Sequence, residues 1–344
     1  MANNGYVSKE VASLMGLIDT YRKWAYSKEH EEGSENRRSY ESYHPSEWGK
    51  CLRLQQYKHY TELGLIQFEV PEFSSTQLRL FDKGHNMHNR WSSYFDGIGN
   101  ILRGRWRCKN LLCWCFGEDG NLKSNLTSEF IDQVYSDNRA RIYGNNDKGG
   151  AFKPTKCICG CSKFDYLETE VVDKDLNFKG RADVVIDCSN LDIDRFEGVR
   201  STFNLEYLPK NGERITGDMN TIGSRSWGFQ LEKRGPHKPY LIQLTIYAYI
   251  LDCDYGVLMY ENKDNSEMKW YKVEKNDEWW DLIKWQSHTM QDMVKDRKLP
   301  PPRPTDKSTY DCKGCEFKKL CHKSGVWKDP NLGKKRRDFY GVLL

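Results

Sequence analysis

The chain has 344 residues, which is longer than one ordinary small domain and leaves room for one large α/β core with attachments. Its 53 basic and 49 acidic residues give a formal net charge of +4, so any basic surface must come from local clustering. No apolar run approaches the length of a membrane span, and the first residues lack the basic-then-apolar order of a signal peptide. We therefore expect a cytoplasmic protein.

Two helices are predicted in the N-terminal part of the chain. Residues 8–28 carry apolar side chains at helical spacing, and the charged stretch that follows is predicted to be a linker ending near Pro45. A second helix is predicted over residues 75–95. Its apolar stripe recurs at intervals of three and four residues: Leu78, Phe81, His85, His88 and Trp91. This spacing places His88 on the inward face of the helix.

The strongest strand signals lie in the second half of the chain. Three segments have strand character: "YLETEVVD" (166–173), "GRADVVIDC" (180–188) and "RITGDMNTI" (214–222). The first two flank a short polar stretch, which predicts a hairpin. In the third, alternation places Asp218 and Asn220 on the same face. A helix is predicted from Pro239 onward, and it carries Gln243 and Tyr247 one turn apart on one face.

Twelve cysteines are present, and nine of them fall into three tight groups. The groups are Cys108, Cys113 and Cys115; Cys157, Cys159 and Cys161; and Cys312, Cys315 and Cys321. In a reducing cytosol, clustered cysteines of this kind are more often metal ligands than disulfides. Cys188 and Cys253 lie alone in apolar stretches, and we expect them to be small buried side chains.

The region of residues 105–163 is predicted to be an insertion that binds zinc. Four of six thiolates would form a zinc ribbon or knuckle: Cys108, Cys113, Cys115, Cys157, Cys159 and Cys161. The C-x-C spacings leave open which four of them bind. Aromatic and basic side chains also alternate here, namely Trp106 and Trp114 with Arg103, Arg105, Arg107 and Lys109. This pattern suits stacking on single-stranded bases, and a metal-stapled structural insertion is the alternative.

Three residues could form a site for a hard divalent cation. His88 lies on a predicted helix, and Asp183 and Asp218 lie on predicted strands. Carboxylate and imidazole ligands that converge on one point suit Mg²⁺ or Mn²⁺, which activates water and neutralises phosphate charge. Alternatively, His88 is a hydrogen-bonded core histidine and the two aspartates pair with nearby arginines.

The order of these motifs resembles the RecB-type nucleases of the PD-(D/E)xK superfamily. "GHNMH" (84–88) is similar to their first motif, "GRADVVID" to the second, "GDMNT" to the third, and "QLTIY" to the helix after it. Cys51, in "SEWGKCLRLQQYKHY", and the C-terminal C-x₂-C-x₅-C resemble the iron–sulfur branch, which includes CRISPR-associated RecB-like exonucleases and the AddB type. The resemblance spans about Pro45 to Lys323.

The resemblance implies a restriction-endonuclease-like α/β core, with a mixed sheet flanked by helices and an iron–sulfur clasp. The implied cluster ligands of a 4Fe-4S centre are Cys51, Cys312, Cys315 and Cys321, and zinc bound with His322 is the alternative. The implied Mg²⁺ or Mn²⁺ ligands are His88, Asp183 and Asp218, with Gln243 and Tyr247 positioning DNA or supporting the site. The implied function is metal-dependent DNA cleavage, exonucleolytic on single-stranded ends, in recombination, repair or phage genome metabolism.

One position departs from the family pattern. Asn220 stands where the third motif carries a lysine, so the geometry is kept and the positive charge is lost. The chain is then a disabled variant, an active form in which Arg225, Lys233 or Lys238 supplies the charge, or a catalytically silent DNA-binding or assembly component. A less favoured alignment uses "NLEYLPK", with Glu206 as the ligand and Lys210 as a displaced lysine.

These patterns divide the chain into five predicted segments. They are an N-terminal helix and linker (1–44), the first cluster cysteine with the first-motif helix (45–104), the cysteine-rich insertion (105–163), the nuclease core (164–300), and a C-terminal cluster-binding segment with a basic tail (301–344).

Overall fold

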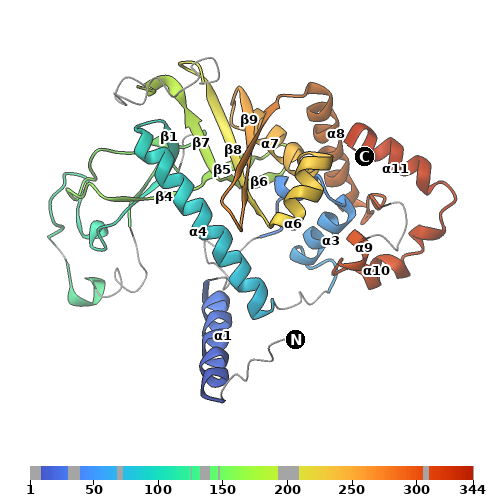
Figure 1. The fold of residues 1–344 in the computed structure, drawn as a ribbon, viewed down its shortest axis with the longest axis horizontal. Helices are drawn as coiled ribbons and strands as arrows, with labels where there is room; N and C mark the ends of the chain where they lie inside the picture. The colour runs from blue at the N-terminus through green and yellow to red at the C-terminus, as the bar shows by residue number, and fades with distance from the viewer. Residues whose placement is uncertain are drawn as a thin grey trace.

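The computed structural model has a mixed α/β fold, in which helices flank a mostly antiparallel sheet (Figure 1). The residues described are 9–29, 39–67, 73–124, 126–131, 140–145, 148–192, 209–304 and 310–343. The predicted α/β class and mixed sheet are confirmed at this level. Most of the predicted linker and Glu206 of the alternative third motif lie outside the described residues. No described helix is both long enough and apolar enough to cross a membrane.

The central sheet has the strand order β10-β9-β8-β7-β1-β2, and β3 and β4 also pair with β1. Its strands are β1 (Leu102–Cys108), β2 (Ile142–Tyr143), β3 (Ala151–Phe152), β4 (Phe164–Leu167), β7 (Val184–Asp187), β8 (Arg214–Ile222), β9 (Tyr255–Asn262) and β10 (Met268–Glu274). Among the strands described, β8 and β9 pair in parallel and the other pairs are antiparallel. Strands β5 (Thr169–Asp173) and β6 (Phe178–Ala182) form a separate antiparallel pair, which confirms the predicted hairpin.

Helices cover both faces of the sheet. The helices described are α1 (Lys9–Glu29), α2 (Pro45–Trp48), α3 (Leu52–Glu62), α4 (Ser75–Ile98), α6 (Ser224–Ser226), α7 (Lys238–Ile250), α8 (Asp277–Lys295), α9 (Tyr310–Lys313), α10 (Lys318–Lys323) and α11 (Leu332–Tyr340). Helix α4 starts at a capping box formed by Ser74 and Gln77. The insertion loops and the C-terminal helices lie at opposite ends of the molecule (Figure 1).

Helices α4 and α7 are the two that carry predicted site residues, and each packs on the sheet. Met87 of α4 belongs to the same core cluster as Val184 of β7 and Met219 of β8. Helix α7 has apolar side chains on all sides, as expected for a buried helix, and its Leu244 packs in a cluster with Leu258 of β9. The sheet residues between these helices are therefore held from both faces.

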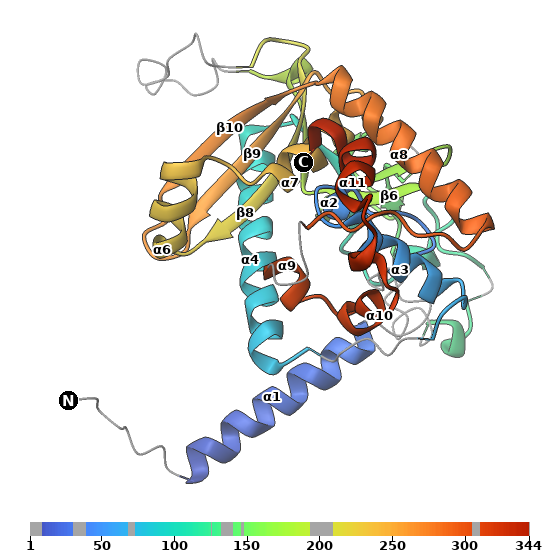
Figure 2. The same cartoon turned by 90° about the vertical axis from the view of Figure 1, so that its right-hand side faces the viewer.

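The two chain ends of the described core meet beside α3. The backbone N–H of Leu52 donates to the Tyr340 hydroxyl at 3.2 Å, and Arg53 donates to the Pro300 carbonyl at 2.9 Å. Figure 2 shows α9, α10 and α11 on this side of the molecule, near α2 and α3. Segments that are some 250 residues or more apart in the chain are thus in direct contact.

The structure corrects three details of the sequence prediction. The predicted segment boundary at residue 105 falls inside β1, whose Leu102 and Arg103 pair with β7 of the central sheet. The strands predicted over residues 166–173 and 180–188 are each divided in two. Strands β4 and β5 belong to different ladders, and so do β6, which forms the hairpin with β5, and β7, which pairs with β8. Phe81 and His85 were predicted on the inward stripe of α4, but both are exposed, Phe81 by 40%. Cys188 and Cys253 are buried, as predicted.

Candidate functional site

Three side chains from separate elements could hold a metal ion together. They are His88 from the middle of α4, Glu168 from the residue between β4 and β5, and Asp183 from the residue between β6 and β7. One ligand atom from each lies within 4.8 Å of the other two. An octahedral cation with ligands at about 2.1 Å places neighbouring ligands about 3 Å apart and opposite ligands about 4 Å apart. The spacing of the three groups is therefore compatible with one shared cation.

The orientation of His88 is fixed by the backbone of β8. Its Nε2 lies 3.0 Å from the carbonyl oxygen of Met219, which can only accept a hydrogen bond, so Nε2 carries the proton that is donated. Nδ1 then faces the carboxylates, 3.6 Å from Glu168 and 3.6 Å from Asp183. Nδ1 is buried and has no hydrogen-bond partner among the described residues. A backbone carbonyl that orients an imidazole in this way is typical of histidine ligands to metals.

Asp183 lies at the point where two neighbouring strands diverge. The β7–β8 ladder ends at Val184 opposite Gly217, and β8 continues to Ile222 beyond it. The backbone N–H of Met219 is free of this ladder and donates to Asp183 Oδ2 at 2.7 Å. The Tyr166 hydroxyl donates to the carbonyl oxygen of Asp183 at 3.0 Å. The fold therefore holds the carboxylate of Asp183 through Met219 and its backbone through Tyr166.

Asp218 and the predicted supporting residues lie beside this group of three. The amide of Gln243 donates to one oxygen of Asp218 at 2.8 Å, and the amide of Asn220 donates to the other at 2.5 Å. The Gln243 amide also lies 3.4 Å from the Tyr247 hydroxyl. These hydrogen bonds connect Asp218, Asn220, Gln243 and Tyr247 in one network. Asp218 itself does not belong to the group of possible ligands formed by His88, Glu168 and Asp183.

Burial and neighbouring charges shift the pKa values of the titratable groups. Burial by itself would lower the pKa of His88, but the carboxylates of Asp183 and Glu168 outweigh it and raise the pKa to about 9. Burial, with the charges of Asp218 and Glu168, raises the pKa of Asp183 well above its usual range, and burial raises that of Asp218 to about 6. Glu168 is also desolvated, but His88 lowers its pKa. A bound cation would relieve this accumulation of negative charge.

Glu168 is the site residue that sequence reasoning missed. It was placed inside a predicted strand, where glutamate is ordinarily a solvated side chain. In the structure it occupies the break between β4 and β5, which frees its side chain to face His88. The available signal was the polar stretch Glu168–Thr169–Glu170, which separates the apolar pair Tyr166–Leu167 from the apolar pair Val171–Val172.

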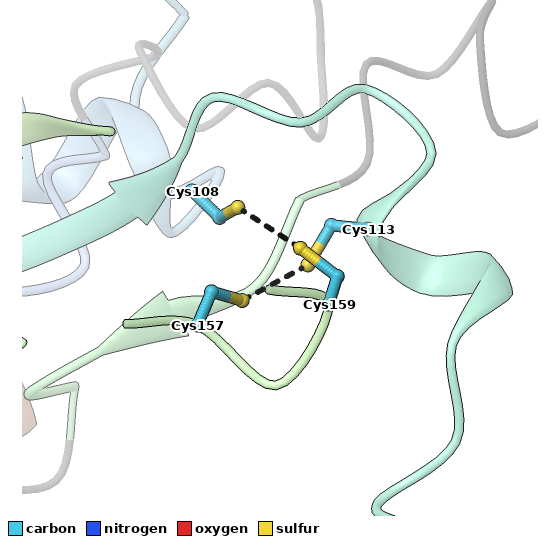
Figure 3. Close-up of side chains that lie close together, drawn as sticks. All are labelled: Cys108, Cys113, Cys157 and Cys159. Atoms are coloured by element: carbon cyan, nitrogen blue, oxygen red, sulfur yellow. Dashed lines mark hydrogen bonds between the residues drawn. The ribbon is translucent and has the colours of Figure 1, made fainter. Parts of the chain in front are cut away.

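A second group of possible ligands consists of four thiols in the insertion. Figure 3 shows Cys108, Cys113, Cys157 and Cys159 pointing toward one another, and we name them the thiol quartet. The sulfurs of Cys108 and Cys159 are 3.6 Å apart, and those of Cys113 and Cys157 are 3.4 Å apart. A tetrahedral zinc–sulfur distance of about 2.3 Å places sulfurs about 3.8 Å apart. The quartet is therefore close to the geometry that one tetrahedral ion requires.

Two short turns bring the quartet together. Cys108 ends β1, and Cys113 begins a 3₁₀ turn five residues later. Cys157 and Cys159 lie in a tight turn, where Gly160 has φ +83° and its N–H donates to the Cys157 carbonyl at 2.8 Å. The two other predicted candidates, Cys115 and Cys161, lie outside the quartet.

The predicted aromatic and basic surface on β1 is wrong for most of its members. Trp106 is buried, 1% exposed, and its indole N–H donates to the Ala151 carbonyl, so it cannot stack on a base. The basic side chains are engaged by carboxylates: Arg103 by Asp187, Arg105 by Glu170, and Arg107 and Lys109 by Asp165. Trp114 is 40% exposed, with Arg141 and Lys123 near its ring. Trp106 lies on the buried face of β1, whereas the sequence analysis predicted that it is exposed.

The remaining four predicted cysteine ligands line one cavity. Cys51, Cys312, Cys315 and Cys321 surround a cavity of about 560 Å³ beside α3, α9 and α10. Burial, together with the charges of the other three thiols, raises the pKa of Cys315 to about 11. The described part of the chain shows no three of these sulfurs within 4.8 Å of one another. His322 also lines the cavity, and its buried Nε2 has no hydrogen-bond partner among the described residues.

Comparisons with known proteins assign no family. No protein-family model matches the chain, and no curated protein matches it. A similar solved structure is that of SSO0001, which is 14% identical, with a TM-score of 0.40 over 90% of this chain and 97% of that one. A TM-score this low carries no argument, so a function can be inferred only from the chain's own residues.

Proposed function

We propose that the chain is a divalent-metal-dependent DNA nuclease of RecB-like, PD-(D/E)xK type that acts on DNA ends. The observation that carries this proposal is the convergence of His88 Nδ1, Glu168 and Asp183, with the imidazole oriented by a backbone carbonyl. Oxygen and imidazole donors of this kind suit Mg²⁺ or Mn²⁺. A cation bound there would supply Lewis acidity for activating water and would offset charge on a scissile phosphate.

The protein residues would contribute orientation and proton control. The Met219 carbonyl keeps one proton of His88 on Nε2, so the proton on Nδ1 is the one that a bound cation would displace, leaving the Nδ1 lone pair as its ligand. Gln243 holds the Asp218 carboxylate in a fixed direction beside Asp183. Because burial raises the pKa of Asp218 to about 6, this carboxylate is ionised above that pH, where it can attract a cation.

We also propose a different inorganic partner for each set of cysteines. The thiol quartet suits Zn²⁺, because its sulfurs are spaced for one tetrahedral ion. Cys51, Cys312, Cys315 and Cys321 surround a cavity and are more widely spaced, which suits a 4Fe-4S cluster, where each thiolate binds a different iron. Zinc bound with His322 is the alternative for the second set, since thiolates serve both metals.

The distribution of charge supports DNA as the partner. Residues 310–343 contain nine basic and four acidic side chains, a formal charge of +5 that exceeds the +4 of the whole chain. Several basic side chains in this segment are exposed, among them Lys319, Lys323, Lys334 and Arg337. A concentration of positive charge on one segment of a nearly neutral protein favours binding to a phosphate backbone.

Asn220 favours a second candidate, a catalytically silent DNA-binding component with the same fold. Its amide donates to Asp218, in the position where a lysine would place a positive charge. Lys238, one suggested substitute, donates to the Val342 carbonyl at 2.9 Å and is engaged there. A neutral amide stabilises developing negative charge less than an ammonium does.

Cleavage of end-labelled DNA distinguishes the two candidates. The chain as it stands, Asn220→Lys, and Asn220→Lys combined with Asp183→Ala would be compared on single- and double-stranded DNA with Mn²⁺. We expect Asn220→Lys to cleave at least 100-fold faster than the parent, the effect of one preorganised charge-stabilising group. The added Asp183→Ala change should abolish cleavage. If none of the three cleaves while all bind DNA, the silent component is the correct reading.

A further inference from the structure

One pair of strands connects the two candidate metal centres. Strands β1 and β4 are antiparallel neighbours, and Cys108 at the end of β1 lies opposite Phe164 at the start of β4. Glu168 directly follows β4, four residues after Phe164, which is about 13 Å along an extended strand. The thiol quartet and Glu168 therefore lie at the two ends of one short ladder.

The quartet closes the open end of this ladder. Cys108 is on β1, and the turn that holds Cys157 and Cys159 leads into β4. Just outside the last strand pair, the N–H of Lys109 donates to the Lys163 carbonyl at 3.0 Å. The four cysteines are free rather than joined in disulfides, so nothing covalent ties the two strands here. An ion bound by the quartet would fix the register of β4 on β1.

Strand β4 also contacts Asp183 through Tyr166. The Tyr166 ring lies over Gly104 of β1, where an added Cβ would come within 2.2 Å of the ring carbon Cε2. This close approach allows the Tyr166 hydroxyl to donate to the Asp183 carbonyl at 3.0 Å. Tyr166 and Glu168 are two residues apart, so a shift of β4 would move both groups together.

We infer that the ion in the thiol quartet is a positioning element for the divalent-cation site. It holds β4 on β1, and β4 in turn sets the positions of Glu168 and Asp183. This inference rests on the proposed binding of Mg²⁺ or Mn²⁺ at His88, Glu168 and Asp183. It assigns the insertion a role in the chemistry of the core, whereas an insertion that only folds its own loops would leave cation binding unchanged.

Mn²⁺ binding tests the inference without any measurement of cleavage. The full-length protein would be purified anaerobically with one equivalent of zinc and freed of excess zinc, because imidazole and carboxylate ligands bind Zn²⁺ more tightly than Mn²⁺. Free Mn²⁺ would be read from its electron paramagnetic resonance signal during titration. The variants are Cys159→Ala, which removes one quartet ligand; Cys161→Ala, a matched control outside the quartet; and Cys159→His, which restores a zinc ligand. Elemental analysis reports the zinc content of each.

We expect Cys159→Ala to lose zinc and to bind Mn²⁺ at least about tenfold more weakly, the size of effect seen when support of a metal ligand is lost. Cys161→Ala should bind Mn²⁺ as the parent does, and Cys159→His should recover most of the affinity together with the zinc. Unchanged Mn²⁺ affinity in a zinc-free Cys159→Ala protein would overturn the inference. A parent protein that binds no Mn²⁺ would instead refute the divalent-cation site itself.

Tyr166→Phe gives a second test that does not disturb the quartet. This change keeps the ring over Gly104 and the zinc, but it removes the hydrogen bond to Asp183. A severalfold loss of Mn²⁺ affinity with zinc retained is expected. Unchanged Mn²⁺ affinity would overturn the part of the inference in which β4 positions Asp183. If Cys159→Ala fails to fold, the Mn²⁺ affinity of the parent with and without bound zinc decides the role of the quartet ion, and equal affinities would overturn it.

Discussion

Two sets of four cysteines differ in how closely their sulfurs approach one another. One set includes Cys108 at the end of β1 and the other includes Cys321 in α10, and these two elements lie far apart (Figure 1). In the thiol quartet of the insertion, two pairs of sulfurs are 3.6 and 3.4 Å apart. In the second set, Cys51, Cys312, Cys315 and Cys321 line a cavity of about 560 Å³ without forming such a group. A single ion draws four thiolates to one point, whereas a multi-iron cluster needs space between them.

The two sets also differ in the length of chain that they join. The quartet spans residues 108–159, within one insertion, while the second set spans residues 51–321 and joins both ends of the core. Closing a longer loop removes more conformational entropy from the unfolded chain. Loss of metal should therefore disorder the insertion in the first case and loosen the whole core in the second.

The largest expected effect belongs to the second set. Cys315→Ser should lose iron and its brown colour, and it should lower the midpoint of thermal unfolding by roughly 4 °C, on the order of 3 kcal/mol for a chain of this size. The measurements are iron content, visible absorption and a thermal melt under anaerobic conditions. Cys161→Ser, which lies outside both sets, is the control. A colourless parent protein that contains only zinc would remove the iron assignment, and an unaltered midpoint would make this set peripheral to stability.

Periodic local patterns predicted the elements that carry most of the candidate site. Strand β8 has the predicted limits, residues 214–222, because strict alternation over nine residues leaves little ambiguity. Helix α4 and helix α7 were also predicted within a few residues, from the apolar stripe at helical spacing in α4 and the N-terminal proline of α7. Positions within these elements, such as His88 and Asp218, followed from the same periodicity.

Features that depend on contacts between distant segments could not be predicted. Which four of six cysteines gather depends on the register of β1 against β4, which places Cys108 opposite Phe164. Glu168 faces His88 because the strand before it pairs with β1 and the strand after it pairs with β6. From the sequence alone, one continuous strand was the simplest prediction for this segment. Trp106 is buried because it packs in one core cluster with Met87 and Phe95 of α4 and donates to the Ala151 carbonyl, so the linear pattern overestimated the exposed aromatic surface.

A smaller effect is the pH dependence of zinc binding by the quartet. Burial raises the pKa of Cys113 to about 12 and that of Cys108 well above its usual range, so both are protonated at neutral pH without metal. Zinc must displace at least these two protons, so its affinity should rise about 100-fold per pH unit near neutrality. Competition with a chromophoric chelator at pH 6.5 and 7.5 measures this slope. In Cys113→Ser one proton fewer is displaced, so the zinc affinity should rise only about tenfold per pH unit. A zinc affinity that does not change with pH would show that zinc does not bind at this quartet.

The smallest expected effect concerns the hydroxyl of Tyr143 beside the quartet. It donates to Cys157 Sγ at 3.2 Å, and although burial would raise the pKa of Cys157, this bond and contacts with neighbouring groups lower it to about 7. Tyr143→Phe keeps the ring contact with Phe164 but removes the donor, so the pKa of Cys157 should rise and zinc should bind about tenfold more weakly at pH 7. Tyr94→Phe, at an exposed position on α4, is the control and should leave zinc affinity unchanged. Equal affinities in both variants would mean that Cys157 is not a ligand, because a hydrogen bond to a metal-binding thiolate cannot be removed without cost.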